Sequence, residues 1–405
     1  MIMAEDAIAS WKGPLAGLRV LDLSRVLAGP FASQMLADLG AEVIKVEPPE
    51  GDDTRHFPPM REGVSHYFLS VNRSKKSIAV DLKTEEGVAI VRELAAISDI
   101  LIENYRPGVM ERLGLGYEAL KVDNPRLIYC AISGFGLTGP LRDRPSFDIV
   151  VQALSGALSV NGEIGRDPTR LGIPLGDLVG GVYGPIAILA ALHERVTTGR
   201  GRLIDVSLLD GMIGMLGYLA QLPFFTGEDP KPQGSEHPNL TPYGIFGTQD
   251  GAVVIACLTD AFWGRVCSAL SLDEARADPR LVTIQGRKDY RSVVTAHILA
   301  RTQSMTVVEL EKLLVAHQVP HAPVLGVQAA LAQPQAVARE MVVEVEHSVL
   351  GTIPIVGPSI KFPGERQAPP TAPPTLGQHT DDILGTILDR DTDLIADLRR
   401  RRIVG

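Results

Sequence analysis

One carboxylate stands out as a candidate for covalent chemistry. Asp177 lies in the segment Leu171-Gly-Ile-Pro-Leu-Gly-Asp-Leu-Val-Gly180, which leads into an apolar run from Val179 to Leu192. Because glycine has no side chain, this segment would let a substrate approach the carboxylate closely, and the apolar run predicts a buried helix. Asp177 is therefore a candidate nucleophile. The ordinary alternative is an N-cap, a helix position at which Asp is among the preferred residues.

Basic side chains follow several strand-like segments. They occur in Asn72-Arg-Ser-Lys-Lys76 and in Glu103-Asn-Tyr-Arg-Pro-Gly108, and Lys45, Lys83 and Arg112 could join them. In open α/β sheets ligands bind outside the carboxyl ends of the strands, so the set could form a basic crevice for a phosphorylated ligand. Taken singly, each residue is explained as well by ordinary surface charge.

Two further patterns carry less weight. Gly134-Phe-Gly-Leu-Thr-Gly139 matches a dinucleotide fingerprint, but Pro140 follows where the phosphate-facing helix should continue, so a tight turn is favoured over a nicotinamide site. His317 and His321 have a ligand-like spacing, and Pro320 interrupts the helix that would place both on one face. We expect no metal and no permanently bound cofactor.

Composition narrows the class of protein. The 405 residues exceed one ordinary domain, and the formal net charge of −9 argues against a nucleic-acid surface. Three cysteines without metal-like spacing favour a reducing, cytoplasmic location. The N-terminal residues lack a basic region, and the long apolar stretches are interrupted by glycines and acids, so neither an export signal nor a membrane span is expected.

Strand-like and helix-like segments alternate through the first two hundred residues. A helix is expected from Pro30 to Leu39, and another from Thr84. Short apolar strands separated by helices predict an α/β fold with a doubly wound parallel sheet. The expected strands are residues 18–23, 42–47, 77–81, 99–103 and 126–131.

The domain organisation is inferred from shifts in composition. Residues 1–225 are expected to form the N-terminal part of a large domain, and residues 226–332 a small domain that begins with a hairpin around Gln249-Asp-Gly251. Residues 333–405 are expected to return to the large domain. Within them, 364–375 contains four prolines and must be extended, and 381–403 predicts two short helices.

Several segments together resemble the class III CoA-transferase family, over nearly the whole chain. The family includes formyl-CoA, carnitine and dicarboxylate CoA-transferases and the α-methylacyl-CoA racemases. The segments that carry the resemblance are Leu23-Ser-Arg-Val-Leu-Ala-Gly-Pro30, Gly40-Ala-Glu-Val-Ile-Lys-Val-Glu47, Ser70-Val-Asn-Arg-Ser-Lys-Lys-Ser77, Glu103-Asn-Tyr-Arg-Pro-Gly108, Gly176-Asp177 and Leu376-Gly-Gln-His-Thr380.

The resemblance implies a Rossmann-like large domain, a smaller α+β domain and an interlocked homodimer, with a coenzyme A thioester as substrate. It places the catalytic carboxylate on Asp177, with aspartyl anhydride and aspartyl-CoA thioester intermediates. Pro48 replaces a basic residue of the formyl-CoA transferases, so contacts to the nucleotide must differ there. The implied residues of the CoA and active-site channel are Leu27, Ala28, Val80, Lys83, Asn104, Tyr105, Arg112 and Asp148.

The reaction within the family is chosen from individual positions. The racemases carry a proton-transferring His where this chain has Phe147, which favours a transferase. The segments around Ser24 and Ser70 are most similar to transferases of dicarboxylic acids that use succinyl-CoA, and Arg25 or Arg73 would hold the distal carboxylate. An acyl-CoA racemase and a non-catalytic CoA-binding homologue are the alternatives.

Overall fold

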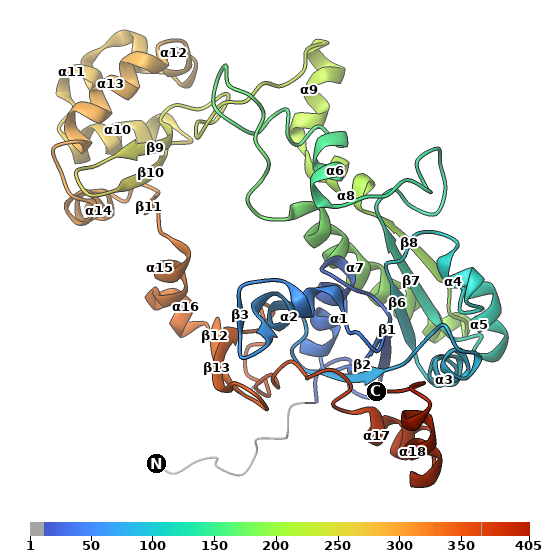
Figure 1. Ribbon diagram of the computed structural model, residues 1–405. Helices are drawn as coiled ribbons and strands as arrows, with labels where there is room; N and C mark the ends of the chain where they lie inside the picture. The colour runs from blue at the N-terminus through green and yellow to red at the C-terminus, as the bar shows by residue number, and fades with distance from the viewer. Residues whose placement is uncertain (1–11, 366) are drawn as a thin grey trace. The chain divides into compact units, whose positions relative to one another are not determined.

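In the computed structural model, which describes residues 12–365 and 367–405, the chain forms two compact units (Figure 1). The first comprises the described residues of Met1–Ala157 together with Leu171–Thr226 and Gln335–Gly405. The second comprises Leu158–Arg170 and Gly227–Pro334. Each unit has its own hydrophobic core.

The first unit is built around a six-stranded sheet in which every strand pair is parallel. The order is β5-β2-β1-β6-β7-β8. From β1 the chain adds β2 and β5 on one side, and it then adds β6, β7 and β8 on the other side of β1. This is the strand order of the doubly wound dinucleotide-binding fold, and the predicted α/β class with a parallel sheet is confirmed. The strands are β1 (Arg19–Asp22), β2 (Glu42–Glu47), β5 (Lys75–Ala79), β6 (Ile100–Glu103), β7 (Ile128–Ser133) and β8 (Leu203–Ser207).

Side chains of the central strands alternate between two cores, one on each face of the sheet. Ile100 and Ile102 enter one core while Leu101, between them, enters the other. Because helices cover both faces, these strands read as continuous apolar runs (Figure 1). One face carries α1 (Ala28–Asp38), α6 (Asp148–Leu154), α7 (Leu175–Thr198) and α8 (Leu208–Met215); the other carries α3 (Glu85–Ala96), α4 (Val109–Arg112), α5 (Tyr117–Asp123), η3 (Ile383–Ile387) and α18 (Thr392–Arg400).

Helix starts follow the sequence signals closely. Thr84 caps α3 as expected, accepting a hydrogen bond from the Gly87 N–H at 3.1 Å. Helix α1 begins two residues before Pro30, which lies in its first turn, and Gly40 follows the helix with φ +99°. The loop at Gly134–Gly139 is a turn after β7, with positive φ at Gly136 and Gly139.

Helix α7 is 24 residues long and apolar enough, by length and composition, to cross a membrane. In the described residues it packs against α1, β7 and β8, and its buried residues join the core on that face. The bent pair formed by α8 and α9 (Tyr218–Thr226) passes the same test only as a pair. A core helix of a folded domain satisfies these criteria as readily as a membrane span, so they do not decide between the two.

The sequence did not predict strand β8 or the hairpin of β12 (Val342–His347) and β13 (Gly351–Val356). Both alternate buried and exposed residues and lack the continuous apolar run of a central strand. The described proline-rich residues 367–375 belong to the first unit, where the Thr371 carbonyl oxygen accepts the Ser74 N–H at 3.0 Å. The smaller elements of this unit are η1 (Asp53–His56), β3 (Met60–Arg61), β4 (Val64–Ser65), α2 (His66–Val71) and α17 (Thr380–Asp382).

The second unit contains a three-stranded antiparallel sheet in the order β11-β10-β9. The predicted hairpin is confirmed, since β9 (Tyr243–Gly247) and β10 (Ala252–Ala256) flank its turn. Strand β11 (His321–Pro323) was expected only as an extended interruption. The helical elements are α10 (Asp260–Leu270), α11 (Asp273–Ala277), η2 (Pro279–Leu281), α12 (Ile284–Asp289), α13 (Arg291–Thr302), α14 (Val307–Ala316) and α15 (Val327–Ala332), with α16 (Pro334–Ala338) at the boundary between the units.

Candidate active site

The strand order places a crevice between β1 and β6, where the sheet reverses its direction of growth. The loops that follow these strands are joined by two hydrogen bonds of 2.8 Å between the Asn104 side chain and the Arg25 backbone. The Arg25 guanidinium lies 5.5 Å from the centre of the Tyr105 ring. The Glu103 carboxylate accepts the Tyr105 N–H at 2.7 Å and fixes that turn. The structure thus brings Arg25, Asn104 and Tyr105 together, and Leu27 and Ala28 enter α1 from the same loop.

Asp177 is the third residue of α7 and not its N-cap, which is Pro174. The capping interpretation of Asp177 is therefore wrong. Its carboxylate is partly buried and forms no hydrogen bond or ion pair with any residue that the structure describes. The neighbouring Asp148 carboxylate accepts the Gly176 N–H at 2.8 Å and the Gln152 side-chain N–H at 2.6 Å. Asp148 is thus held beside Asp177, with its own oxygens already engaged.

This environment changes the acidity of Asp177. Burial raises the pKa of Asp177 from its ordinary value of 3.8 to about 7, and the negative charge of Asp148 adds to the effect. A carboxylate with a raised pKa is more basic and hence a better nucleophile, and it remains substantially ionised near neutral pH. No donor neutralises it in the described residues, so its charge is available to a substrate.

Asp177 lies one helical turn from Gly181, which packs against the beginning of α1. A Cβ on Gly181 would stand 2.9 Å from the Ala28 carbonyl oxygen. One turn corresponds to about 5.4 Å along the helix, so the carboxylate stands next to the crevice at the start of α1. Asp177 and Ala28 were both predicted as site residues, and the fold brings their helices into contact.

Tyr67 is a residue of this region that sequence reasoning missed. Burial raises the pKa of its phenol, and the charges of Asp177, Asp148 and Asp52 raise it further. The ring packs edge-on against Phe57 with centroids 5.5 Å apart. Tyr67 lies on α2, far from Asp177 in the sequence, and no local spacing signals the proximity.

The glycines directly before and after Asp177 on α7 contact protein. The sequence predicted that glycines leave room for a substrate to approach, and of those in segment 171–180 Gly172 has open space around it. A Cβ on Gly176 would stand 2.6 Å from Val151, one on Gly180 would stand 2.2 Å from Leu208, and Gly184 faces Ile132 at 3.2 Å. They allow α7 to pack closely on its neighbours, as small residues do at tight helix contacts.

The other predicted channel residues lie around the same sheet edge but not beside Asp177. Val80 is buried, follows β5 and forms a β-bridge with Val404. Lys83 is exposed just beyond it, and β2 separates β5 from β1. Arg112 is exposed on α4, in the connection after β6.

Several basic residues of the proposed crevice are neutralised inside the protein. The Arg73 guanidinium pairs with Asp38 at 2.5 Å, and both side chains are less than a tenth exposed. Lys75 pairs with Asp22 at 3.0 Å and Lys45 with Asp52 at 2.9 Å, in fully buried positions. Among the predicted basic residues, Arg25, Lys83, Arg106 and Arg112 remain exposed for an anionic ligand.

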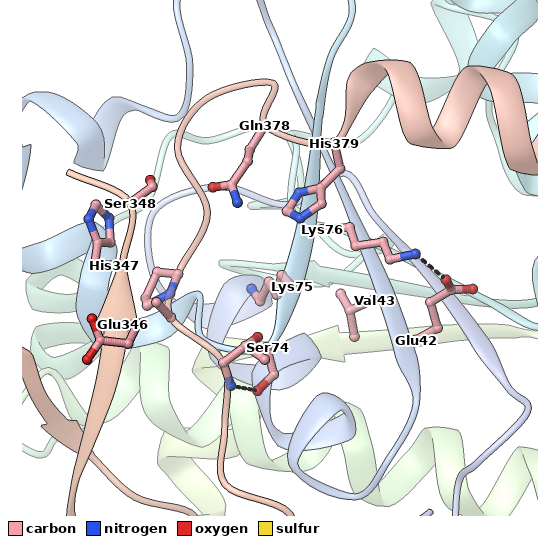
Figure 2. A pocket seen from close by; sticks show the side chains of 13 residues that line it. Glu42, Val43, Ser74, Lys75, Lys76, Glu346, His347, Ser348, Gln378 and His379 are labelled. Atoms are coloured by element: carbon pink, nitrogen blue, oxygen red, sulfur yellow. Dashed lines mark hydrogen bonds and ion pairs between the residues drawn. The ribbon is translucent and has the colours of Figure 1, made fainter. Parts of the chain in front are cut away.

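A cavity of about 690 Å³ lies elsewhere on the first unit (Figure 2). Figure 2 shows Lys76 joined to Glu42, at 3.0 Å, on one side and His347 of β12 on another. Its lining contains none of the predicted catalytic residues. By contrast, a cavity of about 50 Å³ lies at the β1 loop and is lined by Arg25, Asp53 and Tyr105 among others. Asp177 is among the lining residues of neither cavity.

Comparisons with known proteins agree with this architecture. Residues 15–380 match the model of CoA-transferase family III. The chain is 38% identical to succinyl-CoA:glutarate CoA-transferase from Homo sapiens, covering 96% of this chain and 90% of that protein. It is 40% identical to acetyl-CoA:oxalate CoA-transferase from Acetobacter aceti, covering 91% and 95%. A solved CAIB/BAIF family protein from Brucella suis superposes with a TM-score of 0.86 at 38% identity, covering 93% of this chain and all of that one.

A parallel sheet with a carboxylate at its crevice and a family match across nearly the whole chain define one class of protein. The chain belongs to CoA-transferase family III, and it is a CoA-transferase that acts on coenzyme A thioesters.

Proposed function

We propose that this enzyme moves CoA from succinyl-CoA to a dicarboxylic acid, with Asp177 as the nucleophile. The observation that carries the proposal is the Asp177 carboxylate: partly buried, close to Asp148, without a hydrogen-bond partner in the described residues, and next to the crevice between β1 and β6.

The chemistry proceeds through two kinds of acyl intermediate. The Asp177 oxygen attacks the thioester carbonyl of succinyl-CoA, and the C–S bond breaks to give a mixed anhydride and CoA thiolate. The thiolate attacks the aspartyl carbonyl, which releases succinate and leaves an aspartyl-CoA thioester. The acceptor carboxylate attacks this thioester and expels the thiolate again. The thiolate then attacks the acceptor carbonyl, which gives the new acyl-CoA and restores the Asp177 carboxylate.

Asp148 supports this sequence by its charge and its fixed position. Its oxygens are held by the Gly176 N–H and by Gln152, so it stays in place while its charge keeps the neighbouring carboxylate basic. The racemase alternative requires a proton carrier at position 147, where this chain has a phenylalanine that is 74% exposed.

Arg25 is the better candidate for holding the distal carboxylate of the acceptor. Its side chain is 54% exposed, and its only ion-pair partner in the described residues is Asp53, at 3.5 Å. Arg73 would first have to break its buried pair with Asp38. Relatives named for glutarate and for oxalate support a dicarboxylate but leave its length open. The interlocked homodimer and the cytoplasmic location belong to the same proposal.

The decisive experiment traps the acyl-enzyme. Purified protein is incubated with succinyl-CoA and hydroxylamine, and peptides are analysed by mass spectrometry. A hydroxamate on Asp177 is expected, whereas a hydroxamate on another carboxylate contradicts the assignment. The same protein, offered oxalate, glutarate and butyrate as acceptors, should form new thioesters with the dicarboxylates.

Two controls separate the alternatives. A racemase would incorporate deuterium at the α-carbon of a chiral 2-methylacyl-CoA in deuterated water, and we expect no incorporation. A non-catalytic homologue would bind CoA in calorimetry and form no new thioester with any donor and acceptor pair.

A further inference from the structure

The loop that joins β1 to α1 is held in a strained conformation. Val26 has φ +67°, in the left-handed region that a β-branched residue rarely adopts. Such strain persists only where the surrounding structure enforces it, and it concentrates at ligand-binding and catalytic sites. The loop carries Arg25 on one side of Val26 and Leu27 on the other, and both are predicted site residues.

A buried ion pair between Lys45 and Asp52 holds the backbone of the loop. The Lys45 ammonium donates to the Ser24 carbonyl oxygen at 2.8 Å and to the Asp52 carboxylate at 2.9 Å. Both Asp52 oxygens lie 3.3 Å from the Val26 N–H, the amide of the strained residue itself. Asp52 is anchored in turn by the backbone N–H and the hydroxyl of Thr54, at 2.9 and 2.8 Å.

The ion pair between Lys45 and Asp52 stays charged at any physiological pH. Burial opposes ionisation of Asp52, but the Lys45 ammonium and the Thr54 donors hold the pKa of Asp52 at about 2. Burial also opposes the charge on Lys45, yet Asp52, Asp22 and Glu47 hold the pKa of Lys45 above its usual range. Loop geometry should therefore not vary with pH in the range where Asp177 titrates.

Asn104 closes the loop from the side of β6. Its amide accepts a hydrogen bond from the Arg25 N–H and donates one to the Arg25 carbonyl oxygen, so both backbone polar groups of Arg25 are fixed. With its backbone held in this way, Arg25 directs its side chain over Tyr105 and toward Asp53. The contacts made by Lys45, Asp52 and Asn104 all converge on residues 24–26.

We propose that Asp52 is a positioning residue of this enzyme: with Lys45 and Asn104 it holds residues 24–27 in the strained form that presents Arg25 and Leu27 to the acyl-CoA and acceptor site. This inference rests on the proposed function, because it assigns the loop to that site. Asp52 itself touches no substrate in this arrangement. Its effect reaches the reaction through the loop.

The test compares Asp52→Asn with Asp99→Asn. The amide keeps the size of Asp52 and removes the charge that holds Lys45 and the Val26 N–H. Asp99 also forms a largely buried ion pair, with Arg195 at 2.9 Å, but it precedes β6 and therefore lies at the amino ends of the strands, away from the β1 loop. We expect Asp52→Asn to raise KM for succinyl-CoA and for the acceptor by about tenfold and to change kcat less than about threefold, and Asp99→Asn to leave KM within about twofold.

A second readout does not require activity. Hydrogen exchange of the free protein should quicken at least about tenfold for the peptide containing Val26 in Asp52→Asn and stay unchanged in Asp99→Asn. Adding Val26→Gly to Asp52→Asn should bring the raised KM part of the way back to the wild-type value, because glycine adopts positive φ without strain. If Asp52→Asn does not fold, Thr54→Val removes a single donor to Asp52 and should still accelerate exchange of the loop.

The outcomes separate the two proposals. A wild-type protein that neither binds CoA in calorimetry nor forms thioesters contradicts the proposed function. A wild-type protein that transfers CoA, combined with a folded Asp52→Asn variant whose KM and loop exchange are unchanged, overturns the positioning role alone.

Discussion

Asp177 has two properties that a carboxylate nucleophile needs, a raised pKa and an unengaged pair of oxygens. Both follow from a site in which Asp148 accepts the nearby backbone N–H while Asp177 accepts none. The arrangement costs stability, because the folded protein must hold a poorly solvated charge.

We therefore expect Asp177→Asn to abolish transfer and to stabilise the fold. A raised native pKa means that stability is lost as pH rises from about 4 to about 7, at about 1.4 kcal/mol per pH unit. At pH 8 the variant should exceed wild type by ~2–4 kcal/mol in the free energy of unfolding. Urea denaturation measures this, and the difference should nearly vanish at about pH 3, below the unfolded pKa of 3.8, where Asp177 is largely protonated in both states. A variant that is less stable at pH 8 would contradict the assigned environment.

The same pKa predicts the pH dependence of activity. Because the ionised carboxylate attacks, kcat/KM for succinyl-CoA should rise with pH and level off above about 7. Asp148→Asn removes the second cause of the raised pKa of Asp177, so the rise of kcat/KM should move to lower pH. The pKa should stay above its ordinary value because the burial of Asp177 remains. Initial rates between pH 5 and 9 test both statements. A profile that is flat across pH 7 would show that Asp177 does not limit the rate.

Arg25 and Asp53 test acceptor selection. Arg25→Met should lower kcat/KM for the preferred dicarboxylate by about ten- to a hundredfold and leave butyrate nearly unaffected, because one charge-assisted contact is lost. Asp53→Asn frees the arginine from its resting partner and should lower the acceptor KM by about two- to fivefold. Arg202→Met, which breaks a similarly exposed pair with Glu194, is the matched control and should change neither value. Equal losses for both acceptors would assign Arg25 a structural role.

At the scale of elements, the contact between α1 and α7 positions Asp177 relative to the β1 loop. The contact is close because glycines line this side of α7, and a Cβ on Gly181 would meet Phe31 at 2.8 Å and the Ala28 carbonyl oxygen at 2.9 Å. The second of these is backbone and cannot swing aside. Side chains at this contact would push the two helices, and with them Asp177 and the β1 loop, apart.

Substitution of single glycines tests this packing. Gly181→Ala should lower the free energy of unfolding by ~1–2 kcal/mol, because overpacking outweighs the better helix propensity of alanine. Gly214→Ala in α8 is the matched control, since a Cβ there would meet only the Tyr183 hydroxyl at 3.7 Å. It should raise stability by ~0.5–1 kcal/mol. Urea denaturation of both variants gives the signs, and equal signs would contradict the packing argument.

At the scale of the whole molecule, several basic side chains are buried in ion pairs and do not contribute to the charge of the surface. The net charge of −9 leaves the protein acidic, while Lys45, Arg73 and Lys75 neutralise internal carboxylates. Lys83 and Arg112, by contrast, are exposed, and we expect such exposed groups to attract an anionic CoA thioester.

The expected interlocked homodimer is testable at this scale. Light scattering should give twice the chain mass of 43.5 kDa at micromolar concentration. Threaded chains cannot separate without opening, so tagged and untagged dimers mixed in native buffer should not exchange subunits over hours, whereas they should after unfolding and refolding. A monomer, or rapid exchange, would contradict the interlocked arrangement.

The sequence by itself determined the elements and the family. Apolar runs identified the four inner strands, β2, β1, β6 and β7, because both faces of the sheet are buried, and Thr84 identified the start of α3 through a local hydrogen bond. The edge strand β5 was also predicted, and all of its residues except Lys76 are buried. In β8 and β12 about half of the residues face solvent, and the continuous apolar run disappears. Local hydrogen bonding and burial on both faces of a strand depend on residues that are neighbours in the sequence, so both can be predicted without a structure.

Only the tertiary structure decided how the site is composed. The pairing of Arg73 with Asp38, separated by 35 positions, withdraws one of the two arginines considered for the acceptor. The approach of Tyr67 and Asp148 to Asp177, and the burial that raises the Asp177 pKa, depend on how α2, α6 and α7 pack. The bracing of Val26 by Asp52 is likewise a long-range contact. Desolvation and ion pairing arise between segments that are distant in the chain, and no local pattern records which segments will meet.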